Sequence, residues 1–383
     1  MEMNEDAMAA RPMDPSMRKG MGSDAARVQH APLLARLMRR PELGALSGVI
    51  LIYAVFYAVA RNSGMFSVEG IVNILSVSAE IGIIASATTL LMIGGEFDLS
   101  LGSMIGFAGI VIGLGTTQYG LPLSVSVLVA LVLCGGIGAL NGYMTVKTKL
   151  PSFIVTLASM LVLRGLAIAV TRYVAGYTQI SKITATDPDS FIIPLFGGSV
   201  GRGLFQWLAS VGWMGTKSNG APIVDGLPVS IVWWVGLTAV ATWILLRTSF
   251  GNWIFAVGGD EVAARNVGVP VKGVKIILFA VTAISAVLFA ATQITEVGSA
   301  DTLRGTQKEF DAIIAVVIGG TLLTGGYGSA IGALLGALIY GTVQIGILYT
   351  GIDSDLFKVF LGLMVLMAVL FNNYVRRRAT QER

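Results

Sequence analysis

Long apolar stretches separated by short polar ones run through the chain from Leu43 onward. Most of them reach the ~20 residues that a helix needs to cross a bilayer. Backbone groups in lipid find no water to bond, so each stretch is expected to be a helix. The pattern predicts about ten spans, of which the Gly-interrupted ones could be re-entrant. They are Leu43–Ala60, Ile71–Ile93, Leu101–Thr117, Leu121–Val146, Ser152–Val174, Val229–Leu246, Ile276–Ile294, the short Ala312–Leu323, Ser329–Leu348 and Leu356–Tyr374.

The composition also indicates a membrane protein. The chain is 54% hydrophobic and only 13% charged, whereas soluble domains carry about 25% charged residues. The predicted fold is therefore an all-α, polytopic integral membrane protein. The single cysteine, Cys134, excludes an intrachain disulfide. The single histidine, His30, makes histidine-based metal or proton-relay chemistry improbable, and no metal site is expected. The formal charge of +4 reflects basic loops and gives no reason to expect nucleic acid as a partner.

Basic residues orient the predicted spans. They fall before the first span, in alternate loops and at the C-terminal end: Arg36, Arg39, Arg40, Lys147, Lys149, Arg247, Arg265, Lys272, Lys275 and Arg376 to Arg378. The positive-inside rule places all of these clusters, and both termini, in the cytoplasm. Residues 1–42 are polar and are expected to form a disordered cytoplasmic tail, residues 43–378 the transmembrane domain, and residues 379–383 a cytoplasmic end.

One long polar interruption, residues 175–226, is placed outside by the same alternation. It contains Asp187, Asp189 and Asp225 together with several Gly and Pro turns. Trp207 and Trp213 within it could lie along the membrane surface. Two interpretations remain open for this external insertion: a cap packed over the helices, or a docking surface for an external partner.

A second polar interruption, the loop 247–275, is placed on the cytoplasmic side. Gly258 and Gly259 are expected to break the chain, and Asp260 is a suitable N-cap for a short helix of about two turns. Gly268 is expected to end that helix and Pro270 to prevent its continuation. The sequence therefore predicts a capped helix with small Ala faces that a partner can approach closely, against the alternative of a plain solvated loop.

Polar groups between or within the spans are the candidates for a transport pathway. The GGEFDLSLGS stretch sets Glu96, Asp98 and Ser100 between apolar segments, where a charge that faces lipid costs several kcal/mol. It is read either as a re-entrant segment beside the pathway or as a turn with Ser100 capping the next helix. Asn141 and Thr156 lie near helix ends and either bond across helices or line a polar route. Glu80 and Arg164 lie inside predicted spans and could pair, or could line an aqueous cavity.

Glycines at four-residue spacing predict close backbone packing rather than chemistry. The pairs and triples are Gly102/Gly106, Gly109/Gly113, Gly138/Gly142 and Gly328/Gly332/Gly336. Two Gly-rich stretches, Gly94 to Gly106 and Gly319 to Gly332, also resemble each other and hint at the internal repetition found in many transporters.

The motifs together resemble the membrane permease of ribose-type ABC importers. The likeness runs from about Leu43 to Arg378 and rests on GGEFDLSLGS, on Leu140-Asn141-Gly142 followed by Pro151, Phe153, Ile154, Thr156 and Leu157, on GNWIFAVGGDEVAARNVGV, on Glu309 to Ile313 and on VIGGTLLTGGYGSAIGALLGA. The chain departs from the pattern at Asp260, where Asn is expected, and at Phe97, where Ile is commoner. The insertion 175–226 is longer than expected.

This resemblance implies a homodimer in the bacterial inner membrane with one translocation path, an ABC ATPase subunit inside and a periplasmic solute-binding protein outside. ATP is used by the partner subunit, and this chain binds no cofactor; the sequence has no G-x-x-x-x-G-K-[ST] loop. The capped helix is then the coupling helix in a groove of the ATPase. The coupling residues are Gly258, Gly259, Asp260, Glu261, Ala263, Ala264, Arg265 and Gly268. The alternatives are a permease for another solute, such as branched-chain amino acids, and a stand-alone secondary carrier. The sequence does not name the sugar.

Overall fold

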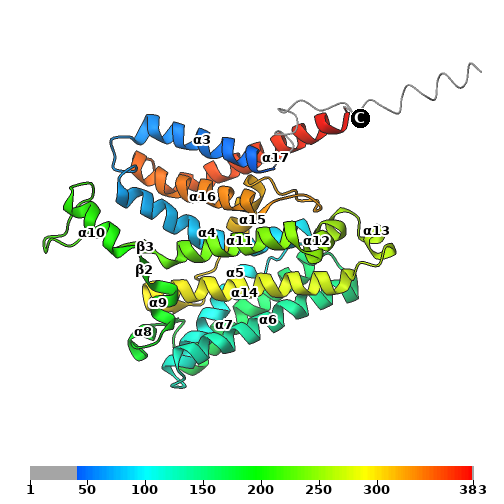
Figure 1. Cartoon of the computed structure of the whole chain (residues 1–383). Helices are drawn as coiled ribbons and strands as arrows, with labels where there is room; N and C mark the ends of the chain where they lie inside the picture. Colours follow the sequence, from blue (N-terminus) through cyan, green and yellow to red (C-terminus); the bar gives the residue numbers. More distant parts are fainter. Residues whose placement is uncertain (1–40, 382–383) are drawn as a thin grey trace, which may run out of the picture. The chain divides into compact units, whose positions relative to one another are not determined.

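The apolar stretches form a bundle of long helices in the computed structural model, which describes residues 41–381 (Figure 1). Seven helices are long and apolar enough to cross a membrane, and residues 101–117 and 357–370 form shorter apolar helices. The predicted all-α, polytopic membrane fold is confirmed. The main helices are α3 (Pro41–Ala60), α4 (Val68–Ile93), α5 (Leu101–Thr117), α6 (Leu123–Thr148), α7 (Ser152–Ala175), α11 (Val229–Arg247), α12 (Ser249–Gly259), α13 (Glu261–Asn266), α14 (Val271–Val297), α15 (Lys308–Ile318), α16 (Ala330–Thr350) and α17 (Phe357–Gln381). The predicted tail, residues 1–40, lies outside the described residues.

The centre of the bundle is made by α4, α14 and α16, which are mostly buried, whereas α3 and α7 expose most of their apolar side chains. Helix α14 packs along α6, and α4 packs against both α16 and α11. An exposed apolar rim around a close-packed centre is what a bundle surrounded by lipid presents. The short helices α12 and α13 lie at one end of the bundle, here called the α13 end, and the insertion 175–226 lies at the other (Figure 1).

The insertion 175–226 packs partly as a cap. It contains α8 (Ile183–Thr186), α9 (Ile192–Gly197) and α10 (Arg202–Ser210), with two-residue strands that pair β1 (Gln179–Ile180) with β4 (Ala300–Asp301) and β2 (Ser199–Val200) with β3 (Leu227–Pro228). Phe196 of α9 stacks on Trp233 of α11, whose Nε1 donates a hydrogen bond to Leu195 O at 2.9 Å. The α9 part therefore covers the N-terminal end of α11, while Trp207 and Trp213 stay exposed.

Helix α15 begins before the predicted span Ala312–Leu323, at Lys308, and ends within it at Ile318, after which the chain turns at Gly319 and Gly320. Residues 298–307, which precede α15, are not a regular helix. They run along α5, where a side chain on Gly106 would meet Thr302 O at 2.5 Å and one on Gly109 would meet Ala300 Cβ at 3.5 Å. The Gly face of α5 was predicted to pack closely, and its partner is an extended segment rather than another helix.

Candidate coupling site

Helix α13 forms the exposed tip of the α13 end. Asp260 is its N-cap, and the Asp260 Oδ1 accepts a hydrogen bond from Ala263 N at 2.9 Å. At the other end, Gly268 has a φ of +88°, and Val269 N donates to Ala264 O at 3.0 Å. This positive φ favours glycine, which has no Cβ to clash. The predicted cap and the predicted end of this helix are both confirmed.

Gly258 and Gly259 do not break the chain, contrary to the prediction, because both belong to the last turn of α12. Helix α12 itself begins with a Thr248 cap, whose Oγ1 accepts from Gly251 N at 3.1 Å. Glycine is needed at 258 for a different reason. A Cβ at that position would collide with the carbonyl oxygen of Ile93 and would lie 2.7 Å from Gly326 N.

Three Gly-rich segments meet at this point, one from the α12 end and two from the turns after α4 and α15. Gly326 N donates a hydrogen bond to Ile93 O at 2.8 Å. A side chain on Gly325 would meet Gly95 Cα at 2.7 Å and Gly258 O at 2.8 Å. The backbone of α12 therefore touches both turns directly, so a displacement of α12 cannot occur without moving them. We call this contact of Gly95, Gly258, Gly325 and Gly326 the glycine junction.

The exposed face of α13 is small and partly apolar. Val262 is 66% and Val267 79% exposed. Ala263 and Arg265 are also exposed, whereas Ala264 is buried against the bundle. Of the predicted coupling residues, Ala263 and Arg265 are thus accessible to a partner, and Ala264 holds the helix in place.

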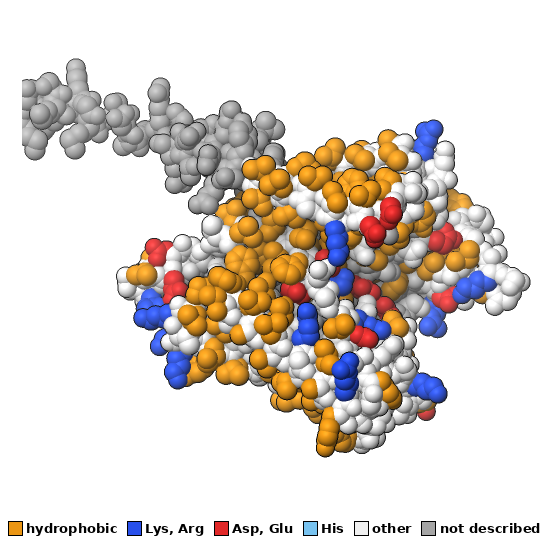
Figure 2. All heavy atoms as spheres, turned by 180° about the vertical axis from the view of Figure 1, so that it is seen from behind, with side chains coloured by type: hydrophobic (Ala, Val, Ile, Leu, Met, Phe, Trp, Pro, Cys, Tyr) orange, Lys and Arg blue, Asp and Glu red, His pale blue; other side chains and the backbone are white. Residues whose placement is uncertain are grey.

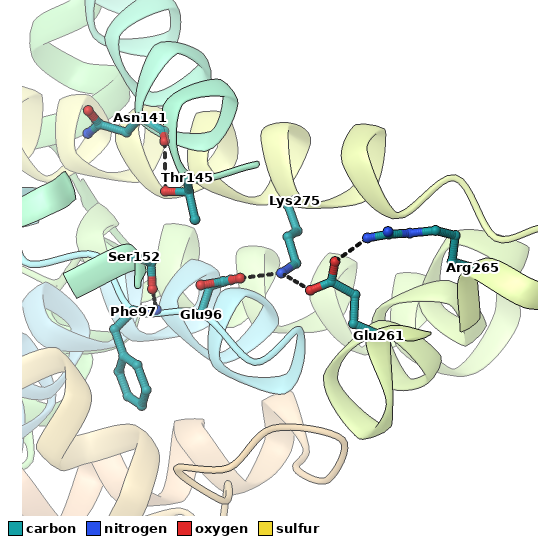
Figure 3. A network of polar contacts seen from close by, with 8 residues as sticks. All are labelled: Glu96, Phe97, Asn141, Thr145, Ser152, Glu261, Arg265 and Lys275. Carbon is teal, nitrogen blue, oxygen red and sulfur yellow. Dashed lines mark hydrogen bonds and ion pairs between the residues drawn. The ribbon is translucent and has the colours of Figure 1, made fainter. Parts of the chain in front are cut away.

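A charged network ties α13 to the inside of the bundle (Figure 3). Lys275 of α14 pairs with Glu96 in the turn after α4, and its Nζ also lies 2.7 Å from Glu261 Oε2. Glu261 in turn accepts from Arg265 at 2.6 Å. The hydrogen bond from Lys275 lowers the pKa of Glu261 below its usual value, against the opposing effect of burial. Because the side chains of Lys275 and Glu96 are only 12% and 10% exposed, this pair is far less screened than a surface pair.

The five predicted pathway residues, Glu96, Asp98, Ser100, Asn141 and Thr156, come together around the turn 94–100 and are all buried. Asn141 Nδ2 donates to Ser100 Oγ at 3.1 Å, and that hydroxyl donates to Asp98 Oδ1 at 2.6 Å. Thr156 Oγ1 accepts from Leu99 N at 3.0 Å. Asp98, Ser100 and Asn141 bond to one another, and Thr156 and Glu96 hold the same turn through Leu99 N and Lys275. Contact with a solute stays a prediction.

One detail of this turn differs from expectation. Ser100 occupies the N-cap position of α5, but its side chain makes no capping hydrogen bond, because its hydroxyl is bonded to Asp98. Burial raises the pKa of Asp98, which lies in the turn between α4 and α5, to about 6, although the hydrogen bonds from Ser100 act in the opposite direction. Its Oδ2 has no hydrogen-bond partner among the described residues.

Sequence reasoning missed four residues of this site. Lys275 was counted only as a basic loop residue, yet it is the shared partner of Glu96 and Glu261. Ser152, whose Oγ accepts from Phe97 N at 3.1 Å, was taken only as the start of a span. Gly325 and Gly326 were not singled out. The available signal was a lysine directly at the edge of the predicted span Ile276–Ile294, where a charge that enters the apolar region needs a partner.

Long apolar helices, two interrupted by Gly-rich turns, and a capped helix projecting at one end define a multi-pass membrane protein of the transporter type. The family whose profile matches residues 70–369 is described as "Branched-chain amino acid transport system / permease component". The chain belongs to this permease family.

Individual relatives cover nearly the whole chain. The ribose import permease protein RbsC of Escherichia coli K12 is 31% identical over 335 residues, 87% of this chain and 94% of the relative. The xylose transport system permease protein XylH of Escherichia coli K12 is 31% identical over 359 residues, 86% and 91% of the two chains. RbsC of Haemophilus influenzae is 32% identical over 330 residues, 86% and 93% of the two chains. No solved structure matches this chain.

Proposed function

We propose that this protein is the transmembrane subunit of an ABC importer that carries a pentose, hexose or related sugar. The observation that carries the proposal is the exposed, capped helix α13, whose Glu261 is joined through Lys275 to a turn inside the bundle. A short helix that presents small side chains suits recognition by a groove on a partner. The names of the relatives, ribose and xylose permeases, support a sugar rather than an amino acid.

The rest of the assembly follows from this assignment. A separate ABC ATPase subunit binds the α13 end and uses the ATP, and a solute-binding protein docks at the insertion 175–226. Two copies of the chain form one path in the bacterial inner membrane, with both termini and α13 in the cytoplasm. Closure of the ATPase pair displaces α13, and the spans rock so that the path opens to each side in turn.

The test is a bulky substitution on the exposed face of α13. Ala263→Trp is expected to leave insertion and folding intact and to abolish co-purification of the ATPase subunit together with ATP-dependent sugar uptake. Ala264→Trp is unsuitable, because that residue is buried. Ser218→Trp, exposed in the insertion at the other end of the bundle, is the matched control and should retain the ATPase.

Transport measurements distinguish the two alternative functions, a secondary carrier and an amino acid permease. Solute movement by the chain alone in proteoliposomes, without ATPase and ATP, would identify a secondary carrier. ATP-dependent uptake of L-leucine with no uptake of sugars would identify an amino acid permease. Unchanged ATPase binding and uptake in Ala263→Trp would show that α13 is not the coupling helix.

A further inference from the structure

A second group of polar side chains lies within the length of the helices, away from the coupling site. Glu80 is part-way along α4 and lies beside Gln293 of α14 and Arg304. Asp301, Gln293 and Arg304 line one small pocket, whose other walls are apolar. Glu80 was expected either to pair with Arg164 or to line a cavity. No ion pair joins these two residues in the part of the chain that the structure describes, so the pairing alternative is wrong.

The backbone near this pocket is unusual for a membrane protein. Residues 298–307 carry Asp301 and Arg304 and are extended or turned rather than helical. They lie in the groove that the glycines of α5 leave open, with Gly109 itself in the pocket wall. Irregular backbone at membrane depth is tolerated where it is enclosed by protein or lines a water-filled cavity. This segment meets the first condition along α5, and on its other side Asp301 and Arg304 line the small pocket.

The charges at the pocket interact without forming direct ion pairs, since Lys308 and Arg304 both lie near enough to Glu80 to attract its carboxylate. Among the described residues, no ion pair includes Glu80, Asp301 or Arg304. Arg304 instead donates to Ser299 O at 2.6 Å and to Ser299 Oγ at 3.1 Å, and Asp301 Oδ1 accepts from Leu303 N at 2.7 Å. Charged groups inside a bundle that are not held in a direct ion pair leave hydrogen-bonding capacity for water or a polar ligand.

The distribution of charged side chains on the surface agrees with a water-filled path in the bundle. Figure 2 shows Lys, Arg, Asp and Glu side chains gathered in a hollow in the middle of one face, with hydrophobic side chains around it. The half-buried residues Arg304, Lys308 and Asp311 belong to the segment that enters the bundle and to the start of α15. Charges gathered in such a hollow are costly against lipid and favourable against water.

We propose that Glu80, Gln293, Asp301 and Arg304 form a solute-contact subsite in the translocation path, suited to a neutral, hydroxyl-rich solute. Each sugar hydroxyl both donates and accepts a hydrogen bond. Carboxylates accept, a guanidinium donates, and an amide does both, so this set matches several hydroxyls at once. The apolar walls, Ile105, Ala290 and Ile294, suit the C–H faces of a sugar ring. The solute class rests on the proposed function; the water-lined position does not.

The experiment measures water access and protection at Gln293. The full chain carries Gln293→Cys with Cys134→Ala, so that a single thiol remains, and is labelled in membranes with a membrane-impermeant methanethiosulfonate. A thiol reacts as thiolate and needs water around it, so Gln293→Cys should react at least about tenfold faster than the matched control Val132→Cys. Val132 is an exposed apolar residue of α6. Leu303→Cys, beside Arg304 and 52% exposed, is a second reporter if Gln293→Cys folds poorly.

Protection then tests the solute class. D-Ribose, D-xylose, D-glucose, D-galactose and L-leucine are added separately, and at least one sugar is expected to slow labelling at Gln293→Cys. Equal rates at the reporters and at Val132→Cys would overturn the water-lined position. Labelling that no sugar slows would overturn the solute contact, and protection by L-leucine alone would overturn the sugar class.

These outcomes are separable from the proposed function. ATP-dependent uptake is measured on the unsubstituted chain with its ATPase subunit and binding protein. If that uptake fails while a sugar protects Gln293→Cys, the subsite holds and the ABC assignment is wrong. If uptake of a sugar succeeds while the reporters stay unlabelled, the ABC assignment holds and the subsite is wrong.

Discussion

The turn after α4 and the turn after α15 begin with the same backbone and are then held in different ways. Gly95 has a φ of +84° and Gly320 a φ of +92°. Glu96 N donates to Leu91 O, and Thr321 N donates to Val316 O, both at 3.2 Å. The two helices therefore end in the same way, with the hydrogen bonds of a Schellman motif. This likeness covers the C-terminal ends of α4 and α15 only, and the internal repetition suggested by the sequence stays a prediction.

Side chains hold the first turn, whereas backbone packing holds the second. Glu96 of the first turn pairs with Lys275, and Asp98 bonds to Ser100. In the second turn Gly325 and Gly326 press against the other two segments of the glycine junction. Charged contacts can be lost and re-formed as water enters, but close backbone contacts admit no added atom. The comparison teaches that α13 is joined to the first turn by an exchangeable charged network, whereas α12 touches both turns through a rigid junction.

The largest effect is expected from breaking the glycine junction. In Gly258→Ala the new methyl group collides with Ile93 O and crowds Gly326 N, which donates to that same oxygen. Overpacking and the lost hydrogen bond together are expected to cost about 3 kcal/mol. Gly259→Ala is the matched control, because nothing lies within 4 Å of a Cβ at that neighbouring position. Thermal unfolding of the detergent-solubilised chain should show a large loss for the first variant only, and equal losses would refute the junction.

Breaking the charged network should give the next largest loss of stability. Lys275→Ala leaves Glu96 unpaired where it is nearly buried, and the expected cost is about 2 kcal/mol, below the range for a fully buried pair because Glu261 is partly exposed. Lys272→Ala, an exposed lysine one turn earlier in α14, is the control and should change stability little.

A double variant distinguishes an unpaired charge from lost packing in this experiment. In Glu96→Gln with Lys275→Met both charges disappear together, and stability should return to within about 1 kcal/mol of the parent. A double variant as unstable as Lys275→Ala would show that the lysine acts through its packing and not through its charge. ATPase-driven uptake by the same double variant should still fall, because α13 would no longer be joined to the first turn by charge.

A smaller effect is expected at the cap of α13. Asp260→Ala removes the acceptor of Ala263 N and should cost about 1 kcal/mol, expressed as fraying of this short helix. Asp260→Asn keeps an acceptor at the same position and should retain both the helix and ATPase binding. Hydrogen exchange at residues 261–266 is the direct measurement. Equal protection in the Ala and Asn variants would mean that the side-chain cap is dispensable.

Local signals predicted part of this arrangement, and contacts between distant segments account for the rest. Span lengths follow from hydropathy, and the limits of α13 follow from Asp260 and Gly268, because a cap acts within a few residues. The role of Gly258 was misread as chain breaking, since only the fold brings Ile93 and Gly326 against it. Lys275 was missed as a partner of Glu96 for the same reason: a pair between segments far apart in sequence leaves no local pattern.

The smallest predicted effect is a pH dependence of the contact between Glu261 and Lys275. The pKa of Glu261 is lowered from its usual 4.5 chiefly by the hydrogen bond from Lys275. The folded state therefore favours the charged form, and this stabilisation is present above pH 4.5 and is lost as pH falls through the lowered pKa. Because the Glu261 side chain is 40% exposed, the contribution should be below about 1 kcal/mol.

The measurement compares Glu261→Gln with the parent chain by thermal unfolding from pH 7 downward. The parent should be the more stable at pH 7, and the difference should shrink as the pH falls below the usual pKa of Glu261. The raised pKa of Asp98, about 6, acts in the opposite direction, since the charged form is disfavoured in the folded state and stability falls as pH rises through that value. Both chains carry Asp98, so its effect cancels in the difference. A difference in stability that is constant with pH would mean that Glu261 stabilises α13 without its charge. The exchangeable charged contact with the first turn would then be the pair of Glu96 and Lys275 alone.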